Sequence, residues 1–365
     1  MSDNARPAVT FALFAYNQEQ FIREAVEGAL AQTYSPLQVV LSDDSSSDRT
    51  FEVMQKMAAD YSGPHDVLLN RNERNLGVGG HVNRMMDLAK GDLIVVAAGD
   101  DVSFPNRVAV LVEQWKTHNK PSALCSGFLS IDEHGKLVGD GHSWFSQFAI
   151  NATQHKAHVL LGFIKTQKPA LIGCTSAWTS EVFEEFGPLG NAIWFEDNAI
   201  SLRAWFLNGI HFVPERLVSY RQHATNISNR AWSVDRSVSG FRRLENDKQE
   251  RAKRWVELLV GYEQDIETAV TCGLVDKPLA NELSTEVARQ IEINKIVGDW
   301  WSATILKRIN WYLRVLLKPE NREYAAWGFA RLVPYELFLL VRALLSRARG
   351  WSRDLVNTTQ SGKGG

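Results

Sequence analysis

Two adjacent aspartates, Asp100 and Asp101, follow an unbroken apolar run, Leu93–Ala98. The run is rich in Val and Ile and lies between Gly91 and Gly99, which is typical of a strand buried on both faces of a parallel sheet. In open α/β sheets, ligands bind beyond the carboxyl ends of the strands, where this pair lies. Adjacent carboxylates repel each other unless a cation lies between them, and such oxygen ligands favour Mg²⁺ or Mn²⁺ held together with substrate phosphates. A solvated turn or a helix N-cap would use the same residue types, so other parts of the chain must decide.

Two further acidic pairs suggest related chemistry. Asp43 and Asp44 follow a second predicted strand, Leu37–Ser42, and would lie at the same edge of the sheet. Glu196 and Asp197 lie in the stretch IWFEDNAISLRAW, whose apolar side chains would raise a carboxylate pKa toward neutrality and suit it to work as a general base. The alternative for this pair is an acidic first helical turn that the helix dipole stabilises.

The elements that must position these residues alternate between strands and helices. Strand patterns occur at Val9–Ala15, Leu37–Ser42, Val67–Leu69, Leu93–Ala98 and Ala123–Ile131. Four helical patterns follow these strands: one that ends near Gln32, one that begins near Arg49, and two at about His81–Leu88 and Pro105–His118. Residues 75–80 are predicted to form a glycine-rich loop. This alternation predicts an α/β fold with a largely parallel sheet, in which the acidic loops after the second and fourth strands face one crevice.

A dinucleotide-binding fold is a rival that the glycine pattern argues against. Its fingerprint needs G-x-G-x-x-G at the start of the first helix, but the first turn here, AYNQEQ, has no glycine. Gly77 and Gly79 occur later, with Val82 where the third glycine belongs. A phosphate-binding lysine loop is also absent, which argues against a nucleotidyltransferase. The carboxylates must therefore bind the ligand, through ribose hydroxyls, a base N–H group or a metal.

The charge of the chain is distributed unevenly. Its 365 residues favour two structural units, and the net charge of −2 argues against a general nucleic-acid binder. The segment 302–365 has 11 Lys or Arg and 4 Asp or Glu, a net charge of +7, so residues 1–301 carry −9. A basic tail on an acidic body suggests an anionic partner surface such as a membrane. The polar N-terminus, the three widely spaced cysteines and the absence of a long apolar run predict a cytoplasmic protein without a membrane span.

A series of motifs connects these pairs. The chain reads FAYNQE at 14–19, AQTY at 31–34, VVLSDDSSSDRT at 39–50, AKGD at 89–92, GDD at 99–101, FED at 195–197 and YRQHATNIS at 220–228. In order and spacing they resemble the family 2 glycosyltransferases, which have the GT-A fold. The resemblance covers roughly Val9 to Ser228 and implies a catalytic domain at 7–228, followed by a helical extension at 229–365 that is a candidate for membrane association.

The resemblance implies a role for each candidate site residue. Residues that would bind the nucleotide sugar are Tyr16, Asn17, Glu19, Asp43, Asp44, Asn83 and Asp100. Asp44 would accept a hydrogen bond from a pyrimidine N3–H group, and Asp101 and His223 would hold Mg²⁺ or Mn²⁺. Asp197 would be the general base and Glu196 would orient the acceptor. Three of these residues have an alternative without function: Tyr16 as a half-buried aromatic, Asp44 as a turn-forming side chain and His223 as a structural histidine.

Two positions depart from the family pattern. Ala98 replaces the first acid of the common D-x-D motif, so only Asp100 and Asp101 remain. Val82 replaces a frequent Arg that would contact the diphosphate, and His81 or Arg84 would have to take its place. These departures affect the metal and phosphate ligands more than the class of reaction.

The resemblance as a whole implies a metal-dependent, inverting glycosyltransferase. It would move a sugar from a nucleoside-diphosphate sugar to a glycan or lipid-linked glycan, in the synthesis of a cell-surface polysaccharide. The alternative is a non-catalytic nucleotide- or glycan-binding module with the same fold, which would bind without turnover.

The chain changes character after Ser228. Val234–Val270 and Asn281–Val297 have amphipathic helical patterns, and Leu-rich turns with Arg then accompany the aromatic residues Trp300, Trp301, Trp311, Tyr312, Trp327 and Trp351. This composition suggests helices that lie in a membrane interface, so that the protein would be peripheral at the inner face of the cell membrane. A helical cap on the catalytic domain or a homodimer interface would explain the same pattern.

Overall fold

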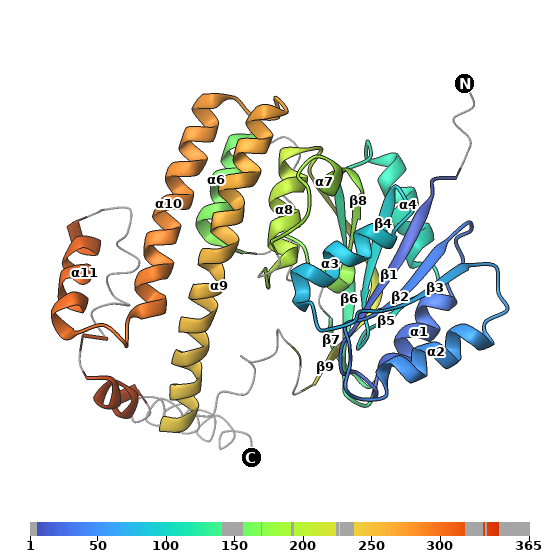
Figure 1. The fold of residues 1–365 in the computed structure, drawn as a ribbon, viewed down its shortest axis with the longest axis horizontal. Coiled ribbons are helices and arrows are strands. Elements are labelled where there is room, and N and C mark those ends of the chain that lie inside the picture. Colours follow the sequence, from blue (N-terminus) through green and yellow to red (C-terminus); the bar gives the residue numbers. More distant parts are fainter. Residues whose placement is uncertain are drawn as a thin grey trace, which may run out of the picture. The chain divides into compact units, whose positions relative to one another are not determined.

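A mixed β-sheet with nine strands in the described part of the chain carries the acidic pairs (Figure 1). The computed structural model describes residues 6–140, 156–168, 170–190, 193–223, 226, 237–317, 331–332 and 334–342. The strands are β1 (Val9–Ala15), β2 (Gln38–Asp43), β3 (Asp66–Arg71), β4 (Leu93–Ala98), β5 (Val102–Ser103), β6 (Ala123–Asp132), β7 (Leu137–Asp140), β8 (Ser176–Thr179) and β9 (Ile210–Gln222). Their order is β3-β2-β1-β4-β8-β6-β9-β5, and β7 pairs with β6. Strands β3, β2, β1 and β4 are mutually parallel, so their carboxyl ends lie at one edge.

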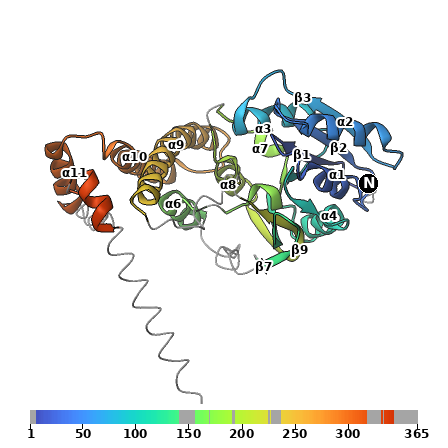
Figure 2. The same cartoon turned by 90° about the horizontal axis from the view of Figure 1, so that it is seen from below.

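The helices of the first half follow these strands. They are α1 (Ile22–Leu30), α2 (Thr50–Asp60), α3 (Gly77–Leu88), α4 (Arg107–Thr117), α6 (Lys156–Thr166), α7 (Glu181–Glu184) and α8 (Glu196–Phe206). Helices α1, α2 and α4 lie close to one another against the sheet (Figure 2). Alternate residues of β1 (Val9, Phe11, Leu13 and Ala15) pack with them in one buried core. The intervening residues of β1 face α3, where the Phe14 ring lies 4.9 Å from that of His81. Both faces of the central strands are therefore buried, which is why their sequences read as unbroken apolar runs.

Two long helices follow, α9 (Val238–Thr271) and α10 (Lys277–Asp299). The chain divides into two compact units, residues 1–226 with 257–290, and residues 227–256 with 291–365. Within the first unit, the buried Arg203 of α8 pairs with Asp265 of α9 at 3.0 Å. Tyr262 donates a hydrogen bond to the Asn198 carbonyl at 3.2 Å. The end of α9 is thereby fixed to α8, the helix that begins with the second acidic pair.

The second unit is organised around a buried carboxylate, that of Glu245. Arg331 donates to it through Nη2 at 2.8 Å and Nε at 3.0 Å, and Arg342 donates at 2.7 Å. Burial opposes ionisation, yet the hydrogen bonds and charge of Arg331 lower the pKa of Glu245 to about 2. Nearby, Phe241, Phe338 and Leu339 form a small apolar cluster with Trp301 at its edge. This unit also contains α11 (Ile305–Leu317), whereas Trp327 and Trp351 lie outside the described residues.

The predicted α/β alternation is confirmed, and two strands, β1 and β4, have the predicted bounds. One local prediction is wrong, because the glycine-rich segment is not a loop to its end: α3 already begins at Gly77. Gly79 lies so close to the Gly190 carbonyl that a Cβ atom would be 2.6 Å from its oxygen. The lack of a side chain at Gly79 therefore allows α3 to pack closely against the backbone of Gly190. Among the helices that the structure describes, none has the length and apolar character that crossing a membrane requires.

Candidate active site

The loops after β1 and β2 are fixed to each other by side chains that the sequence marked as donor-binding. Asn17 has a φ of 51°, in the left-handed region that asparagine tolerates. Its Oδ1 accepts a hydrogen bond from the Ser47 backbone N–H at 2.8 Å. Glu19 Oε2 accepts from the Arg49 N–H at 3.0 Å, and the Glu19 N–H donates to Asp48 at 3.1 Å. Asn17 and Glu19 thus hold the two loops together rather than projecting freely.

Asp43 is the last residue of β2 and Asp44 follows it, and the two have different partners. Asp43 is fully buried and accepts from the Ser46 N–H and hydroxyl, which closes the turn after the strand. Asp44 accepts from Asn72 Nδ2 at 2.8 Å and from the N–H groups of Leu76 at 2.9 Å and Gly77 at 3.1 Å. Its carboxylate therefore organises the start of α3 at the same edge of the sheet.

Tyr16 directly follows β1 and lies at that edge with its side chain open to solvent. The residue is 48% exposed, which is unusual for a large aromatic residue next to a buried strand. The exposed ring offers a stacking surface for a planar ligand, at the same edge of the sheet as Asp44.

Asp100 and Asp101, the pair after β4, have different surroundings, and Arg221 of β9 contacts both residues. The Arg221 N–H donates to Asp101 Oδ1 at 2.8 Å, and its Nε donates to the Asp100 carbonyl at 2.9 Å. Its Nη2 continues to Glu24 of α1 at 2.8 Å. Asp101 points inward and is 4% exposed, whereas the Asp100 carboxylate lies 3.1 Å from His223 Nε2. The structure thus places His223 beside Asp100.

The surroundings of Asp101 disfavour its charge. Burial and the neighbouring Asp100 raise the pKa of Asp101 to about 8, against the hydrogen bond from Arg221. The Cys174 side chain also hydrogen-bonds to Asp101, and the buried Arg107 guanidinium lowers the pKa. Asp101 is therefore enclosed by fixed side chains, whereas Asp100 has a contact that a ligand can share.

Glu196 and Asp197 form the first turn of α8 and are half-buried. Burial, with a further contribution from Asp197, raises the pKa of Glu196 to about 8, and burial raises that of Asp197 to about 6. The Asn198 N–H donates to Asp197 Oδ1 at 2.8 Å, as expected at a helix N-terminus. A carboxylate with a pKa close to neutrality has the properties of a general base.

A single short turn, η1 (Gly173–Thr175), contacts the pair Asp100–Asp101 and the pair Glu196–Asp197. Cys174 hydrogen-bonds to Asp101, while a Cβ atom on Gly173 would lie 2.9 Å from Glu196 Oε1. The pair after β4 and the pair at the start of α8 therefore lie on two sides of the same turn, although about 95 residues separate them in the sequence.

The residues present fit a divalent cation only in part. Asp100 and His223 provide one oxygen and one nitrogen donor 3.1 Å apart, whereas no group of three or more His, Cys, Asp or Glu ligands occurs among the residues that the structure describes. Mg²⁺ is commonly held by one or two carboxylates, and substrate phosphates complete its coordination. The site therefore fits a cation that binds together with a diphosphate.

Three polar residues of α3 have other contacts. Asn83 exchanges two hydrogen bonds of 2.8 Å with the backbone of Leu189, and so lies apart from the other predicted donor-binding residues. His81 is buried and bonds to Ser42 at 2.7 Å, and Arg84 lies 3.5 Å from Asn70. His81 and Arg84 thus have protein partners, and a diphosphate contact from either stays a prediction.

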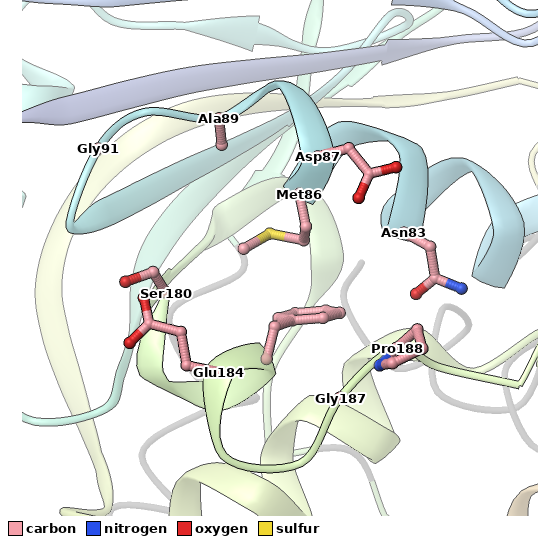
Figure 3. Close-up of a pocket in the computed structure, with 10 residues that line it drawn as sticks. Asn83, Met86, Asp87, Ala89, Gly91, Ser180, Glu184, Gly187 and Pro188 are labelled. Atoms are coloured by element: carbon pink, nitrogen blue, oxygen red, sulfur yellow. The ribbon is translucent and has the colours of Figure 1, made fainter.

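Asn83 instead lines a separate cavity of about 370 Å³ between α3 and α7 (Figure 3). Its other walls include Met86, Phe183 and Gly91. Gly91 precedes the amino end of β4, so this cavity lies away from the edge that carries Asp100.

Sequence reasoning missed Arg221, Gly173 and Cys174. Arg221 was visible only as part of the YRQHATNIS motif, whose last residues, 227 and 228, lie outside the described structure. Gly173 and Cys174 belong to no motif, and only the fold brings them to the acidic pairs. The one signal in the sequence was the position of Arg221, two residues before His223 in that motif.

Comparison with known proteins shows which family and fold the chain resembles. The model of the family described as "Glycosyl transferase family 2" matches residues 10–173. The Bacillus subtilis protein named "Putative glycosyltransferase EpsE" is 32% identical over 132 residues, which is 36% of this chain and 47% of EpsE. The chain thus spans about half the length of that relative. The uncharacterized protein Mb1547 of Mycobacterium bovis is 35% identical over 321 residues, covering 87% of this chain and 84% of that protein.

Among solved structures, S. aureus TarS 1–349 shares the fold. Its TM-score is 0.51 over 94% of this chain and 87% of that chain, at 13% identity, and it has also been solved with UDP. The chain belongs to glycosyl transferase family 2, with a GT-A-type fold and additional C-terminal helices. The family and the fold class predicted from the sequence are thereby confirmed.

Proposed function

We propose that this protein transfers a sugar from a nucleoside-diphosphate sugar to a hydroxyl group of a glycan or lipid-linked glycan, with inversion at the anomeric carbon. The observation that carries the proposal is the turn η1, which contacts Asp101 through Cys174 and Glu196 through Gly173. The acidic pair that contains the candidate base is thus close to the pair suited to a diphosphate. Such proximity supports displacement of a nucleoside diphosphate by a bound acceptor.

The nucleoside would bind at the carboxyl ends of β1 and β2. Tyr16 offers its exposed ring to the base, and Asp44, held by three donors, keeps acceptor capacity for a base N–H group. Asn17, Glu19 and Asp43 would act by keeping these loops in place. For Asn83 the contacts favour a structural role, although its donor-binding role stays a prediction.

The diphosphate would bind near the end of β4. The contacts favour Asp100 and His223 as the residues that would hold Mg²⁺ or Mn²⁺, because Asp101 is enclosed by Arg221 and Cys174. The role of Asp101 as a ligand stays a prediction. Such a cation, when bound, offsets the charge that develops on the departing diphosphate.

Asp197 would start the transfer by accepting the proton of the acceptor hydroxyl. The hydroxyl oxygen then forms a bond to the anomeric carbon on the face opposite the diphosphate. The bond between that carbon and the phosphate oxygen breaks, and its electron pair leaves with the nucleoside diphosphate. Glu196 would orient the acceptor, and the half-buried position of both carboxylates limits competing attack by water.

Thermal-shift measurements with UDP, GDP, dTDP and CMP, with and without Mn²⁺, test the donor site. UDP is the first choice because S. aureus TarS, which shares the fold, has been solved with it. We expect a nucleoside diphosphate to raise the Tm, more so with Mn²⁺. If no nucleotide changes the Tm under either condition, the donor site is refuted.

Release of nucleoside diphosphate from a nucleotide sugar then tests turnover. We expect slow hydrolysis without an acceptor and faster release with a glycan acceptor. Binding without any release would favour the non-catalytic binding module instead.

The biological setting is a proposal of the same kind. We propose that residues 7–228 form the catalytic domain and that the enzyme works in cell-surface polysaccharide synthesis. Its place would be the cytoplasmic face of the cell membrane, because lipid-linked acceptors lie there and the segment 302–365 has a net charge of +7. A homodimer is compatible with this setting.

A further inference from the structure

The helix α11 (Ile305–Leu317) has an apolar face that the described residues of its own unit leave exposed. Ile305 is 43% exposed, Leu306 75%, Ile309 39% and Leu313 51%. At about 100° per residue, these four side chains lie within an arc of about 100° on one side of the helix. Aliphatic side chains of this size are normally buried in the core when a helix is amphipathic.

The opposite side of α11 already holds the helix in place. The Trp311 ring lies 6.1 Å from that of Trp300, which is buried. The Arg308 guanidinium lies over the Trp301 ring at 5.3 Å and donates to the Arg331 carbonyl at 3.2 Å. The exposed arc is therefore not needed for packing within the described part of this unit.

The helical residues 335–342 add a second exposed apolar patch in the same unit. Leu337 is 47% exposed, Leu340 49% and Val341 44%. Among the residues that the structure describes, seven of the twelve exposed large apolar side chains lie in these two short helices. Such a concentration marks an interaction surface rather than ordinary surface composition.

The charges around α11 select the partner. Lys307 and Arg314 are exposed beyond one edge of the apolar arc, and the segment 302–365 carries +7. A second copy of this face would bring like charges together, whereas anionic lipid headgroups would attract them. Apolar side chains in the acyl boundary with cations at headgroup level are the arrangement of an interfacial helix.

We infer that α11 is the membrane-binding element of this protein. Ile305, Leu306, Ile309 and Leu313 enter the outer part of an anionic lipid layer, while Lys307 and Arg314 contact the headgroups. The inference rests on the proposed membrane location and adds the surface that mediates it.

Flotation of the full-length protein with vesicles tests the assignment. The vesicles contain phosphatidylcholine alone or with phosphatidylglycerol, at low and high salt. We expect binding to the anionic vesicles that salt weakens. The double variant Leu306→Gln/Leu313→Gln should bind the anionic vesicles with an affinity lower by about tenfold or more, because two leucine side chains no longer enter the apolar layer. Lys307→Gln/Arg314→Gln should lose a similar factor on anionic vesicles only.

The strand β7 supplies a matched control. Leu137 and Val138 are 60% and 52% exposed, so Leu137→Gln/Val138→Gln changes equally open apolar residues outside α11. This control should bind as wild type, and all variants should hydrolyse the donor at the wild-type rate.

Three results would overturn the inference. If the wild type binds anionic vesicles and the Leu306/Leu313 variant binds equally well, another surface mediates binding, and the proposed location survives. If the wild type binds no vesicles, the location fails as well. If sedimentation equilibrium shows a dimer that the same variant dissociates, a second copy covers the arc.

Discussion

Two of the acidic pairs, Asp100–Asp101 and Glu196–Asp197, each consist of adjacent residues, but different parts of the structure hold them in place. The pair Asp100–Asp101 is held by β9 and the residue that follows it. The Arg221 backbone N–H donates to the Asp101 carboxylate, Arg221 Nε donates to the Asp100 carbonyl, and His223 Nε2 lies 3.1 Å from the Asp100 carboxylate. The pair Glu196–Asp197 begins a helix, and its stabilising hydrogen bonds come from backbone N–H groups. Contacts from a distant strand fix a carboxylate in one position, as binding requires. In the second pair, burial outweighs the hydrogen bonds of the helix N-terminus and raises both pKa values toward neutrality, as a general base requires.

The largest expected effect is that of Asp197→Asn. The amide keeps the shape and hydrogen bonding of the side chain but cannot accept a proton. We expect kcat to fall by about 10²- to 10⁴-fold, with donor affinity nearly unchanged. The measurement is initial-rate transfer to a glycan acceptor, or donor hydrolysis in its absence.

Glu196→Gln is the matched control for that variant. It should act mainly on the acceptor KM, because Glu196 is proposed to orient the acceptor. If Asp197→Asn transfers at the wild-type rate and Glu196→Gln is inactive, the two roles are reversed. If both remain active, the base lies elsewhere.

The second prediction separates Asp100 from Asp101. We expect Asp100→Ala to remove the gain in nucleoside-diphosphate affinity on addition of Mn²⁺, a loss of about tenfold or more, with little change in the Tm without ligand. Asp101→Ala should instead lower that Tm, because it leaves the buried Arg221 N–H without its acceptor. Isothermal titration and thermal unfolding of both variants measure the two effects.

The opposite pattern would restore the assignment made from the sequence. If Asp101→Ala keeps the wild-type Tm and alone removes the Mn²⁺ effect, Asp101 is the ligand despite its enclosure. Asp44→Ala distinguishes the nucleoside from the metal, since it should weaken nucleotide binding even without Mn²⁺.

The sequence predicted five of the nine described strands because their signals are local, whereas β5, β7, β8 and β9 were not predicted. The run Leu93–Ala98 is apolar throughout and ends at glycine on both sides, and the structure has a strand with the same bounds. The helix α3 was harder, because Gly77 and Gly79 are typical of a loop, and the approach of the Gly190 backbone that makes Gly79 useful is a contact between distant segments.

The site shows the same limit. Motifs pointed to Asp100, Asp101 and His223, but which aspartate faces the histidine depends on Arg221, which is 120 residues away from Asp101. Contacts of that range follow from the strand order, in which β9 lies beside β5, and a linear motif carries no such information.

The third prediction is a pH profile that reports the second acidic pair. Asp197 must be ionised to accept a proton, and burial raises its pKa to about 6. The rate should therefore fall about tenfold per pH unit below that value. In Glu196→Gln this acidic limb should remain near pH 6, because burial is the cause of the shift. An acidic limb near pH 4 in the wild type would contradict the assignment of Asp197.

The same pair should also affect stability. Burial raises the pKa of Glu196 from its ordinary 4.5 to about 8, so the folded protein binds more protons than the unfolded chain between these values. The stabilising contribution of protonated Glu196 is complete below pH 4.5 and is lost as the pH rises to about 8. We expect the Tm to fall over this window, and to fall less in Glu196→Gln.

The smallest expected effect comes from Gly173→Ala, and it tests whether η1 connects the two pairs. The added Cβ would lie 2.9 Å from Glu196 Oε1, so the Glu196 side chain must move by a few tenths of an ångström. Because the proposed base is the neighbouring Asp197, we expect the acceptor KM to rise a few fold while kcat and donor affinity change little. Gly162→Ala in α6 is the control, since a Cβ there meets nothing within 4 Å. Equal kinetics for both variants would mean that Glu196 moves aside without consequence, and that the contact through η1 does not position the acceptor.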